Sequence, residues 1–277
     1  MPSAHDMGRE ARVQQALAVT SVPTAKILLV DDGELVGRPC YVMEKVPGQI
    51  VRGDLPDGYA ETAEQRRAMA DVFIDVLVDL HAVDHEAVGL GDYGRPAGFL
   101  ERQVRRWTGQ WEKSRTRDVP EVDELARRLA AAIPTQQRSS IAHGDYRFDN
   151  VVFAPDDPGA IGAVLDWELS TIGDPLADVG MLMLFWREPG ESFPPLIPGV
   201  TNLPGFPTRA EVLDRYAARS GADLSDLDPY IAFAHFKFAV IAQGVAARSA
   251  AGAMGGQDFG NLDAEIRRLA TEGLELV

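Results

Sequence analysis

The feature that most constrains this chain is a polar stretch at its centre, IAHGDYRFDN at residues 141–150. It places one His, two Asp, one Arg and one Asn within eight positions, directly after an apolar lead-in. The short apolar stretches NVVFA and AIGAVLDWE follow, separated by the turn sequence PDDPG. A polar stretch between short apolar segments is either a solvated turn or a loop that carries a chemical site.

The spacing of three side chains favours the chemical site. Asp145 and Asn150 lie five residues apart on a loop that leads into a strand, and Asp166 follows sixteen residues later, at the end of a second strand. Oxygen donors that converge from adjacent strand ends suit a hard cation such as Mg²⁺. A further carboxylate can accept a proton from a hydroxyl group. A metal that neutralises phosphate charge, together with a base that orients the attacking oxygen, is the requirement of phosphoryl transfer.

Hydrophobic periodicity predicts an α+β fold in two parts. A helix is expected at residues 7–18, followed by a hairpin of strands at 25–32 and 38–46. A small part at residues 1–47 and a large part at residues 48–277 would then be joined by a hinge after Val46. The large part is expected to be mainly helical, with two short strands in its middle and an irregular loop at 187–207. Its helices are expected at about 63–80, 98–113, 121–132, 176–186, 208–220, 229–250 and 262–272.

Two of these helices can be described more closely. Thr62 and Gln65 form a capping-box pattern ahead of an amphipathic stretch with a single apolar stripe, which predicts a helix start. His81 and His235 fall on apolar helix faces and are expected in the core, as is Phe233. His143 is likewise expected to be a buried structural histidine rather than a base.

Composition excludes several classes of protein. The formal net charge is −15 and the pI is about 4.7, which argues against a nucleic-acid-binding face. The sequence has no apolar run of 18 residues and no secretory signal, so neither a membrane nor a secreted location is expected, and the cytoplasm is the default. Cys40 is the single cysteine, which excludes an internal disulfide and a cysteine-based zinc site.

The two central motifs resemble those of a known family. HGDYRFDN followed by LDWELSTIGDPLADVG is similar to the signature of the aminoglycoside phosphotransferases, and most similar to the kinase-like domain fused to some acyl-CoA dehydrogenases. This resemblance implies a protein-kinase-like fold of two lobes. It also implies an enzyme that uses ATP and Mg²⁺ to move the γ-phosphate to a hydroxyl group of a small molecule.

The resemblance implies a role for each residue of the motifs. Asp145 would be the catalytic base, and Asn150 and Asp166 would hold Mg²⁺. Arg147 stands two positions after Asp145, where protein kinases have a lysine that touches the transferred phosphate. His143 would brace the loop.

Further roles follow from matches outside the motif loop. Asp178 would tie that loop from behind. The stretch CYVMEKVPG resembles the strand that ends in the adenine-binding hinge, which places Met43 behind the adenine and the backbone groups of Glu44 and Val46 at its edge. GREARV resembles the helix whose glutamate pairs with a phosphate-binding lysine, which makes Glu10 the candidate.

The chain departs from the family pattern at its start. A glycine-rich turn and a basic residue should precede the first helix, on three strands that need about 20–30 residues. Only eight residues precede Arg9, and the chain has no lysine before Lys26, while Lys45 lies in the hinge. The small lobe is therefore expected to be truncated. We expect a native start upstream of Met1; the alternative is a short chain whose two strands leave an unprotected edge.

Two other functions remain open on sequence grounds. The first is a pseudokinase-type module that binds a nucleotide or another ligand without catalysis. The second is a metal-dependent hydrolase that uses His143, Asp145, Asp149 and Asp166. The acceptor is also open, because the acidic charge favours a cationic molecule whereas the resemblance favours a hydroxyacyl thioester or a hydroxy acid. The oligomeric state does not follow from the sequence.

Overall fold

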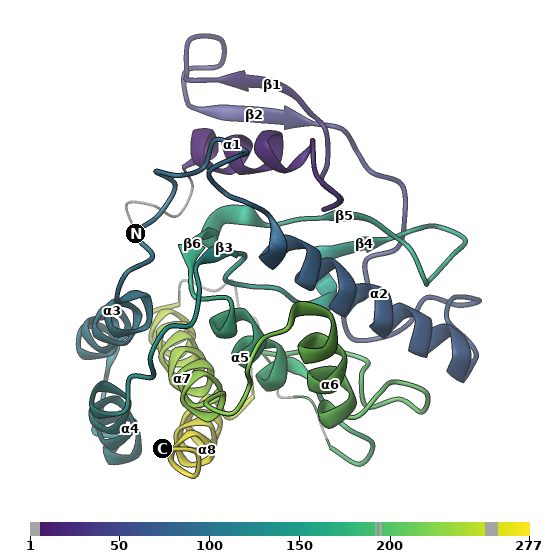
Figure 1. Cartoon of the computed structure of the whole chain (residues 1–277). Coiled ribbons are helices and arrows are strands. Elements are labelled where there is room, and N and C mark those ends of the chain that lie inside the picture. The colour runs from purple at the N-terminus through teal and green to yellow at the C-terminus, as the bar shows by residue number, and fades with distance from the viewer. Residues whose placement is uncertain (1–5, 192, 194–195, 253–259) are drawn as a thin grey trace.

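The computed structural model describes residues 6–191, 193, 196–252 and 260–277. Its elements form a small part that contains one helix and a hairpin, and a larger, mainly helical part beneath it (Figure 1). The prediction about the start of the chain, at Met1 or upstream of it, falls outside the described residues. So do residues 192 and 194–195 of the expected loop. The remaining described residues of 187–207 contain no helix or strand, in agreement with the prediction.

The small part consists of α1 (Met7–Leu17), β1 (Ile27–Asp31) and β2 (Cys40–Met43), as the sequence predicts. The Asp6 side chain caps α1 by accepting a hydrogen bond from the Arg9 N–H at 3.0 Å. β1 and β2 pair antiparallel in a sheet of two strands that lies above α1 (Figure 1). The Asp31 carboxylate accepts hydrogen bonds from the backbone of the turn, which fixes the hairpin.

The segment after β2 connects the two parts. The backbones of Gln49 and Phe153 exchange two hydrogen bonds of 2.9 Å, so this segment lies along a strand of the larger part. Gly48 makes the approach possible: it has a φ of +152°, and a Cβ atom there would stand 2.1 Å from the Phe153 carbonyl oxygen. Only a residue without a side chain fits so close to the neighbouring backbone.

The larger part contains two short antiparallel strand pairs. β4 (Val151–Phe153) pairs with β5 (Ile161–Val164), and these are the two strands expected from the sequence. β3 (Ser140–Ala142) pairs with β6 (Thr171–Gly173), and this pair was not predicted. Strands of three residues are too short to show a period of two. The expectation of only two strands in the middle of the chain was therefore wrong.

The expected helices of the larger part are confirmed, with ends that shift by one or two residues. The predicted capping box of Thr62 and Gln65 is present. Two short 3₁₀ turns, η1 (Phe148–Asn150) and η2 (Trp167–Leu169), were not expected. The helices are α2 (Ala63–Ala82), α3 (Phe99–Ser114), α4 (Pro120–Ala131), α5 (Leu176–Phe185), α6 (Arg209–Ser220), α7 (Asp228–Ala250) and α8 (Leu262–Leu274).

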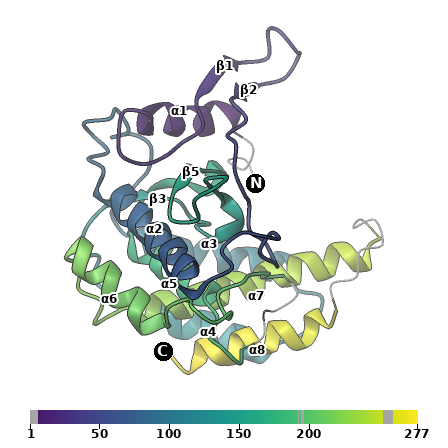
Figure 2. The same ribbon diagram turned by 90° about the vertical axis from the view of Figure 1, so that its right-hand side faces the viewer.

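The core of the larger part is built around α7, which packs against α5 and α8 (Figure 2). Gly180 allows the close crossing of α5 and α7, because a Cβ atom there would lie 2.5 Å from the Tyr230 carbonyl oxygen. By length and composition α7 could cross a membrane, yet 72 % of its apolar window is buried inside the structure. That burial is the behaviour of a core helix.

Candidate functional site

The polar stretch at residues 143–150, here called the motif loop, runs from β3 to β4 and contains η1. Gly144 shapes its first turn, with a φ of +83°. A Cβ atom at this position would stand 2.8 Å from the carbonyl oxygen of Leu169. Both the positive φ and the close contact require glycine at position 144.

His143 is fully buried at the base of the motif loop. Its Nε2 donates to the carbonyl oxygen of Leu165 at 2.9 Å, and its Nδ1 then accepts the N–H of Asp145 at 3.3 Å. Burial lowers the pKa of the imidazole, although the negative charges of the nearby carboxylates raise it. With both ring nitrogens engaged, His143 is placed to hold the loop and not to bind a metal. The geometry therefore gives no support to the hydrolase.

Asp178 lies behind the motif loop, on the first turn of α5. Its carboxylate accepts the backbone N–H groups of His143 at 2.6 Å and Gly144 at 2.8 Å. His81 Nε2 lies 3.2 Å from the same carboxylate, and His81 Nδ1 lies 2.8 Å from the Tyr216 hydroxyl. Burial opposes ionisation of Asp178, but the hydrogen bond with His81, nearby positive charge and the loop N–H groups lower its pKa.

The structure thus places Asp178 where the sequence expected it. It also gives His81 more than the packing role expected from its apolar helix face, because His81 orients the buried carboxylate. No local sequence signal could have revealed this contact, since the two residues are 97 positions apart.

Asp145 and Asn150 are joined directly. The Asn150 side-chain Nδ2 donates to Asp145 Oδ2 at 3.1 Å and to the Asp145 carbonyl oxygen at 2.9 Å. The Asn150 Oδ1 accepts no hydrogen bond from the described residues. The Asp145 side chain stays partly exposed, as a group that meets a substrate must be.

Asp166 leaves β5 beside Asn150. The N–H of Leu165 donates to the Asn150 carbonyl oxygen at 2.8 Å, and β4 and β5 pair Val151 with Val164. Asp166 is exposed and has a φ of +62°, a conformation that costs a non-glycine residue free energy and is concentrated at functional sites. Its carboxylate has no hydrogen bond or ion pair within the described residues.

The oxygen atoms of Asn150 and Asp166 therefore suit Mg²⁺, which is bound by few protein oxygens and takes its other ligands from water and phosphate. Among the described residues, no group of three or more His, Cys, Asp or Glu side chains could hold a metal ion. The described residues therefore contain no metal site made wholly of such side chains. Asn150 and Asp166 would hold the ion through one amide and one carboxylate.

Arg147 is held by the carboxylates of its own loop. Its Nε lies 3.0 Å from Asp149 Oδ1 and 3.4 Å from Asp145 Oδ2. The guanidinium group stands 5.7 Å from the centre of the Phe185 ring. Burial raises the pKa of Asp149, although the charge of Arg147 opposes this. Contact of Arg147 with a transferred phosphate remains a prediction.

The hinge residues stand at the junction of the two parts. Met43 is 40 % exposed, and the Glu44 N–H donates to the Lys26 carbonyl oxygen at 2.9 Å. Within the described residues, the Glu44 carbonyl oxygen and the Val46 N–H have no hydrogen-bond partner. These are the two backbone groups that the sequence assigns to an adenine edge, and that assignment stays a prediction.

Glu10 lies on α1 beneath β2. The Tyr41 hydroxyl donates to Glu10 Oε2 at 3.2 Å. Burial raises the pKa of the Tyr41 phenol, and the negative charges of Glu10 and Asp166 add to the effect. Pairing of Glu10 with a lysine remains a prediction.

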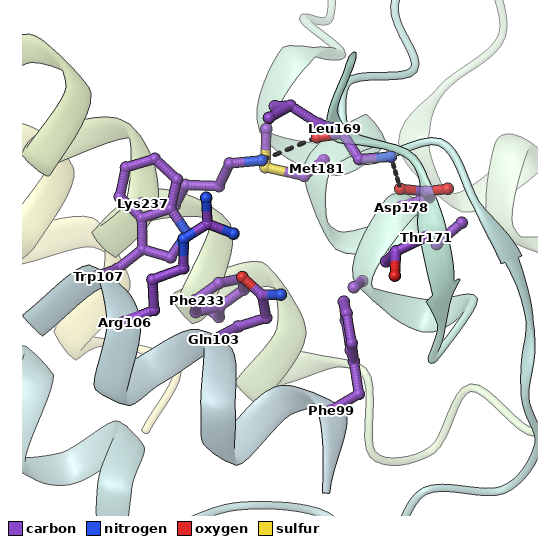
Figure 3. A pocket seen from close by; sticks show the side chains of 13 residues that line it. Phe99, Gln103, Arg106, Trp107, Leu169, Thr171, Asp178, Met181, Phe233 and Lys237 are labelled. Atoms are coloured by element: carbon purple, nitrogen blue, oxygen red, sulfur yellow. Dashed lines mark hydrogen bonds between the residues drawn. The ribbon is translucent and has the colours of Figure 1, made fainter. Parts of the chain in front are cut away.

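A small pocket lies between the motif loop and helices α3, α5 and α7 (Figure 3). Lys237 of α7 points into it and donates from Nζ to the Gly144 carbonyl oxygen at 2.8 Å. Burial lowers the pKa of Lys237, whereas the charges of Asp145 and Asp178 raise it. Lys237 was not among the residues predicted from the sequence. The available signal was a lone lysine in the apolar run YIAFAHFKFAVIAQG.

A second small pocket also borders the motif loop. It is lined by Arg147 and Asp149 together with the aromatic side chains Phe73, Phe148, Phe185 and Trp186. The two pockets thus border different residues of the motif loop, Gly144 in the first and Arg147, Phe148 and Asp149 in the second.

A small part of one helix and a hairpin above a mainly helical part that carries the motif loop is the arrangement of a kinase-like phosphotransferase. The family model described as "Phosphotransferase enzyme family" matches residues 2–230, and the chain belongs to this family. A solved structure from Ralstonia eutropha JMP134, described as that of "a putative aminoglycoside phosphotransferase", is 37 % identical, with a TM-score of 0.86. The alignment covers 99 % of this chain and 83 % of that one. The expected kinase-like fold is thereby confirmed.

Curated relatives include much longer proteins. Acyl-CoA dehydrogenase family member 10 of Mus musculus is 38 % identical over 91 % of this chain and 24 % of its own length. Acyl-CoA dehydrogenase family member 11 of Homo sapiens is 36 % identical over 100 % of this chain and 36 % of its own length. The chain thus spans about a quarter to a third of these relatives. The resemblance to the kinase-like branch fused to such dehydrogenases is confirmed.

Proposed function

We propose that this protein transfers the γ-phosphate of ATP to a hydroxyl group of a small molecule, with Mg²⁺ as the metal. The observation that carries the proposal is the arrangement of Asp145, Asn150 and Asp166. The amide nitrogen of Asn150 donates to the carboxylate of Asp145, and the Leu165 N–H donates to the Asn150 carbonyl oxygen, so Asp166 follows directly after a residue bound to Asn150. In this proposal Asp145 is the base, and Asn150 and Asp166 are the metal ligands beside it.

Each residue has a separate task in this proposal. Asp145 accepts a hydrogen bond from the acceptor hydroxyl, orients it for attack and takes its proton as the new bond to phosphorus forms. Asn150 and Asp166 hold Mg²⁺, which neutralises charge on the phosphates when it is bound. His143 and Asp178 keep the motif loop in place through its backbone, so Asp145 needs little reorganisation before reaction.

The nucleotide would bind between the two parts. The Glu44 carbonyl oxygen can accept a hydrogen bond from an adenine amino group, and the Val46 N–H can donate to a ring nitrogen. Met43 would contact the flat face or the back of the base. Glu10 would order whichever cation neutralises the phosphates on that side. Selectivity for ATP over GTP would depend on this donor and acceptor order.

The decisive experiment measures phosphate transfer and nucleotide binding separately. ADP release is followed with ATP, MgCl₂ and a panel of hydroxyl compounds, and nucleotide affinity is measured by calorimetry with and without Mg²⁺. We expect Asp145→Asn to lower turnover by about 10²–10⁴-fold, the usual contribution of a positioned base, while ATP still binds. We expect Asp166→Asn to remove the Mg²⁺-dependent gain in nucleotide affinity.

Asp156→Asn is the matched control, because Asp156 is an exposed carboxylate on the turn between β4 and β5. It should leave both readouts unchanged. Loss of ATP binding in Asp145→Asn would contradict the role of base. Mg²⁺-dependent ATP binding without transfer to any acceptor, equal in the unchanged chain and Asp145→Asn, would favour the non-catalytic module.

A further inference from the structure

Lys237 is a lysine at a position where the fold favours an apolar residue. It lies within α7, a core helix, and only 7 % of it is exposed. The other lysines of the chain, Lys26, Lys45 and Lys113, are all exposed. Burying an amino group costs more free energy than burying an apolar group of the same size. A methionine would fill the same space without that cost, so the nitrogen of Lys237 needs an explanation.

The side-chain nitrogen of Lys237 is directed at the backbone of the motif loop (Figure 3). Its Nζ donates to the Gly144 carbonyl oxygen at 2.8 Å and stands 5.8 Å from the centre of the Trp107 ring. No carboxylate of the described residues lies within the 4.0 Å of an ion pair with it. The polar contact that explains the buried nitrogen is therefore the one with a peptide carbonyl group.

Gly144 is held on both sides by side chains from the helices behind the loop. Its N–H donates to Asp178 Oδ1 at 2.8 Å, while its carbonyl oxygen accepts the hydrogen bond from Lys237 (Figure 3). These two groups belong to successive peptide planes. Glycine has no side chain whose packing could fix its own backbone. The orientation of the two planes around Gly144 therefore depends on Asp178 for the first and on Lys237 for the second.

The peptide group that Lys237 contacts is the one that leads into Asp145. Its N–H end, which belongs to Asp145, donates to His143 Nδ1 at 3.3 Å, a long hydrogen bond. Its carbonyl end is bound by Lys237 at the shorter distance of 2.8 Å. Because a peptide group is planar and rigid, its tilt sets the direction in which the next Cα–Cβ bond leaves the loop. Lys237 thus acts on the aim of the Asp145 side chain without touching it.

We propose that Lys237 is a positioning residue for Asp145, holding the Gly144–Asp145 peptide group in the orientation that phosphate transfer needs. The hydrogen bond stands on the structure alone, whereas its effect on transfer rests on the proposed function. Asp178 binds two backbone N–H groups and His81, so its loss should disturb the loop as a whole. Lys237 binds the loop at one carbonyl group, so its loss should tilt one peptide group and leave the loop folded.

The first experiment observes the Gly144–Asp145 peptide group by NMR and needs no turnover. Labelling with ¹³C-carbonyl glycine and ¹⁵N-aspartate gives a correlated signal only at Gly-Asp peptide bonds. Asp145→Asn identifies the signal of interest, because it removes this peptide bond from the labelled set. In Lys237→Met we expect the Gly144–Asp145 signal to move, since the carbonyl group loses its donor. An unmoved signal overturns the proposal.

The same spectrum contains its own references. The Gly53–Asp54 and Gly91–Asp92 peptide bonds lie outside the motif loop and should keep their signals, which also shows that the variant is folded. Lys113→Met, at an exposed lysine of α3, is the matched control and should move none of the signals. If Lys237→Met does not fold, Lys237→Gln takes its place. The glutamine nitrogen is one atom closer to the main chain, so the same displacement is expected, and its absence contradicts the proposal.

The second experiment asks whether Lys237 acts through Asp145. We expect Lys237→Met to lower kcat by about ten- to a hundredfold at unchanged affinity for ATP, because a misplacement of about 1 Å can cost about 10²-fold. In the Asp145→Asn background the same substitution should have almost no further effect, since residues that act as a unit are not additive. An unchanged kcat, weaker ATP binding, or a full additional loss in the double variant overturns the positioning role.

The two experiments separate this inference from the proposed function. If the unchanged chain transfers phosphate to no acceptor, the proposed phosphotransferase fails, and the effect of Lys237 on transfer fails with it. Movement of the Gly144–Asp145 signal in Lys237→Met would still support the hold of Lys237 on the loop. If the chain transfers phosphate and Lys237→Met does so at the full rate, the proposed function stands and the positioning role is wrong.

Discussion

At the scale of single residues, the carboxylate of Asp178 holds the motif loop by three contacts with His143, Gly144 and His81. Asp178→Asn would present an N–H₂ group to donors that need an acceptor. Removing one partner from such a buried charged network costs about 3–5 kcal/mol. We expect that loss in the free energy of unfolding, measured with urea.

Asp149→Asn is the control for this prediction, since it also removes a motif-loop carboxylate. Asp149 pairs with Arg147 at the edge of the loop, and burial already raises its pKa toward the neutral form. Its replacement should cost less than about 1 kcal/mol. An equal loss in the two variants would show that Asp178 has no special structural role.

His143 makes stability depend on pH. Burial lowers its pKa below that of an exposed histidine, near 6.5, so the unfolded chain takes up a proton more readily than the folded chain. The contribution of His143 to the free energy of unfolding is complete above pH 6.5. It is lost as the pH falls from there toward the pKa that His143 has in the folded chain. Asp178, whose pKa lies below its usual 3.8, loses its contribution only at lower pH.

We therefore expect the free energy of unfolding to begin falling below about pH 6.5, well before the carboxylates titrate. The measurement is a series of urea titrations between pH 5 and pH 8. His143→Gln keeps a neutral polar side chain and should flatten this slope, even though its overall stability is lower. A slope that persists in His143→Gln would assign the effect to another group.

Residues of the site could be predicted where a short pattern carries them. Asp145, Asn150 and Asp166 stand at a recognisable spacing around two strands; the structure joins the side chains of Asp145 and Asn150, and the roles of all three stay a prediction. Lys237 could not be assigned, because its contact with Gly144 spans 93 positions and no spacing rule connects α7 with the motif loop. Such contacts are set by helix packing, which a single sequence does not specify.

At the scale of elements, the turn of the motif loop at Gly144 depends on close packing as well as on backbone conformation. Gly144→Ala would combine a φ of +83° with a Cβ atom 2.8 Å from the Leu169 carbonyl oxygen. Gly221, after α6, has a φ of +68° and open space around it. Gly221→Ala should therefore cost only the conformational term of about 1–2 kcal/mol.

Gly144→Ala should cost about 1–3 kcal/mol more than Gly221→Ala, because neighbouring backbone must also move. It should lower phosphate transfer as well, since Asp145 is the next residue. The two free energies of unfolding are compared by urea denaturation under one set of conditions. Equal values would mean that the approach to Leu169 relaxes without cost.

The helices were predictable because they are long, amphipathic and marked at their ends, as Thr62 and Gln65 mark α2. The pair of β3 and β6 was not predictable, because each strand has three residues and they join Ser140 to Gly173 across the motif loop and Asp166. A local pattern reports periodicity, whereas pairing of very short strands is decided by what packs around them. The 3₁₀ turns η1 and η2 are also only three residues long, so they too show no periodicity in the sequence.

At the scale of the whole molecule, a few contacts orient the small part over the motif loop. Arg9 of α1 donates to the carbonyl oxygens of Tyr93 and Ser170 and stacks on the Tyr93 ring at 3.7 Å. The order of elements predicted two parts and a hinge, but not Arg9, whose partners lie 84 and 161 positions away. The relative position of the hinge and Asp166 depends on such contacts.

The small part also carries the exposed apolar surface of the described chain. The large hydrophobic side chains that remain exposed all lie between residues 19 and 50, and β1 and β2 pair only with each other. A two-stranded sheet with open edges is a site for strand-to-strand association. Repulsion between chains of net charge −15 opposes it at neutral pH and low salt.

We therefore expect association to grow when salt screens that repulsion, since the screening length falls from about 30 Å at 0.01 M to about 3 Å at 1 M. Sedimentation velocity at pH 7.5 in low and high salt measures it. Leu28→Lys, on β1, should reduce the association and change the free energy of unfolding by less than about 0.5 kcal/mol. Val19→Lys adds the same charge at a more exposed side chain beyond α1 and outside the hairpin. If Val19→Lys reduces association equally, added charge and not the hairpin is the cause; if neither variant does, another surface associates.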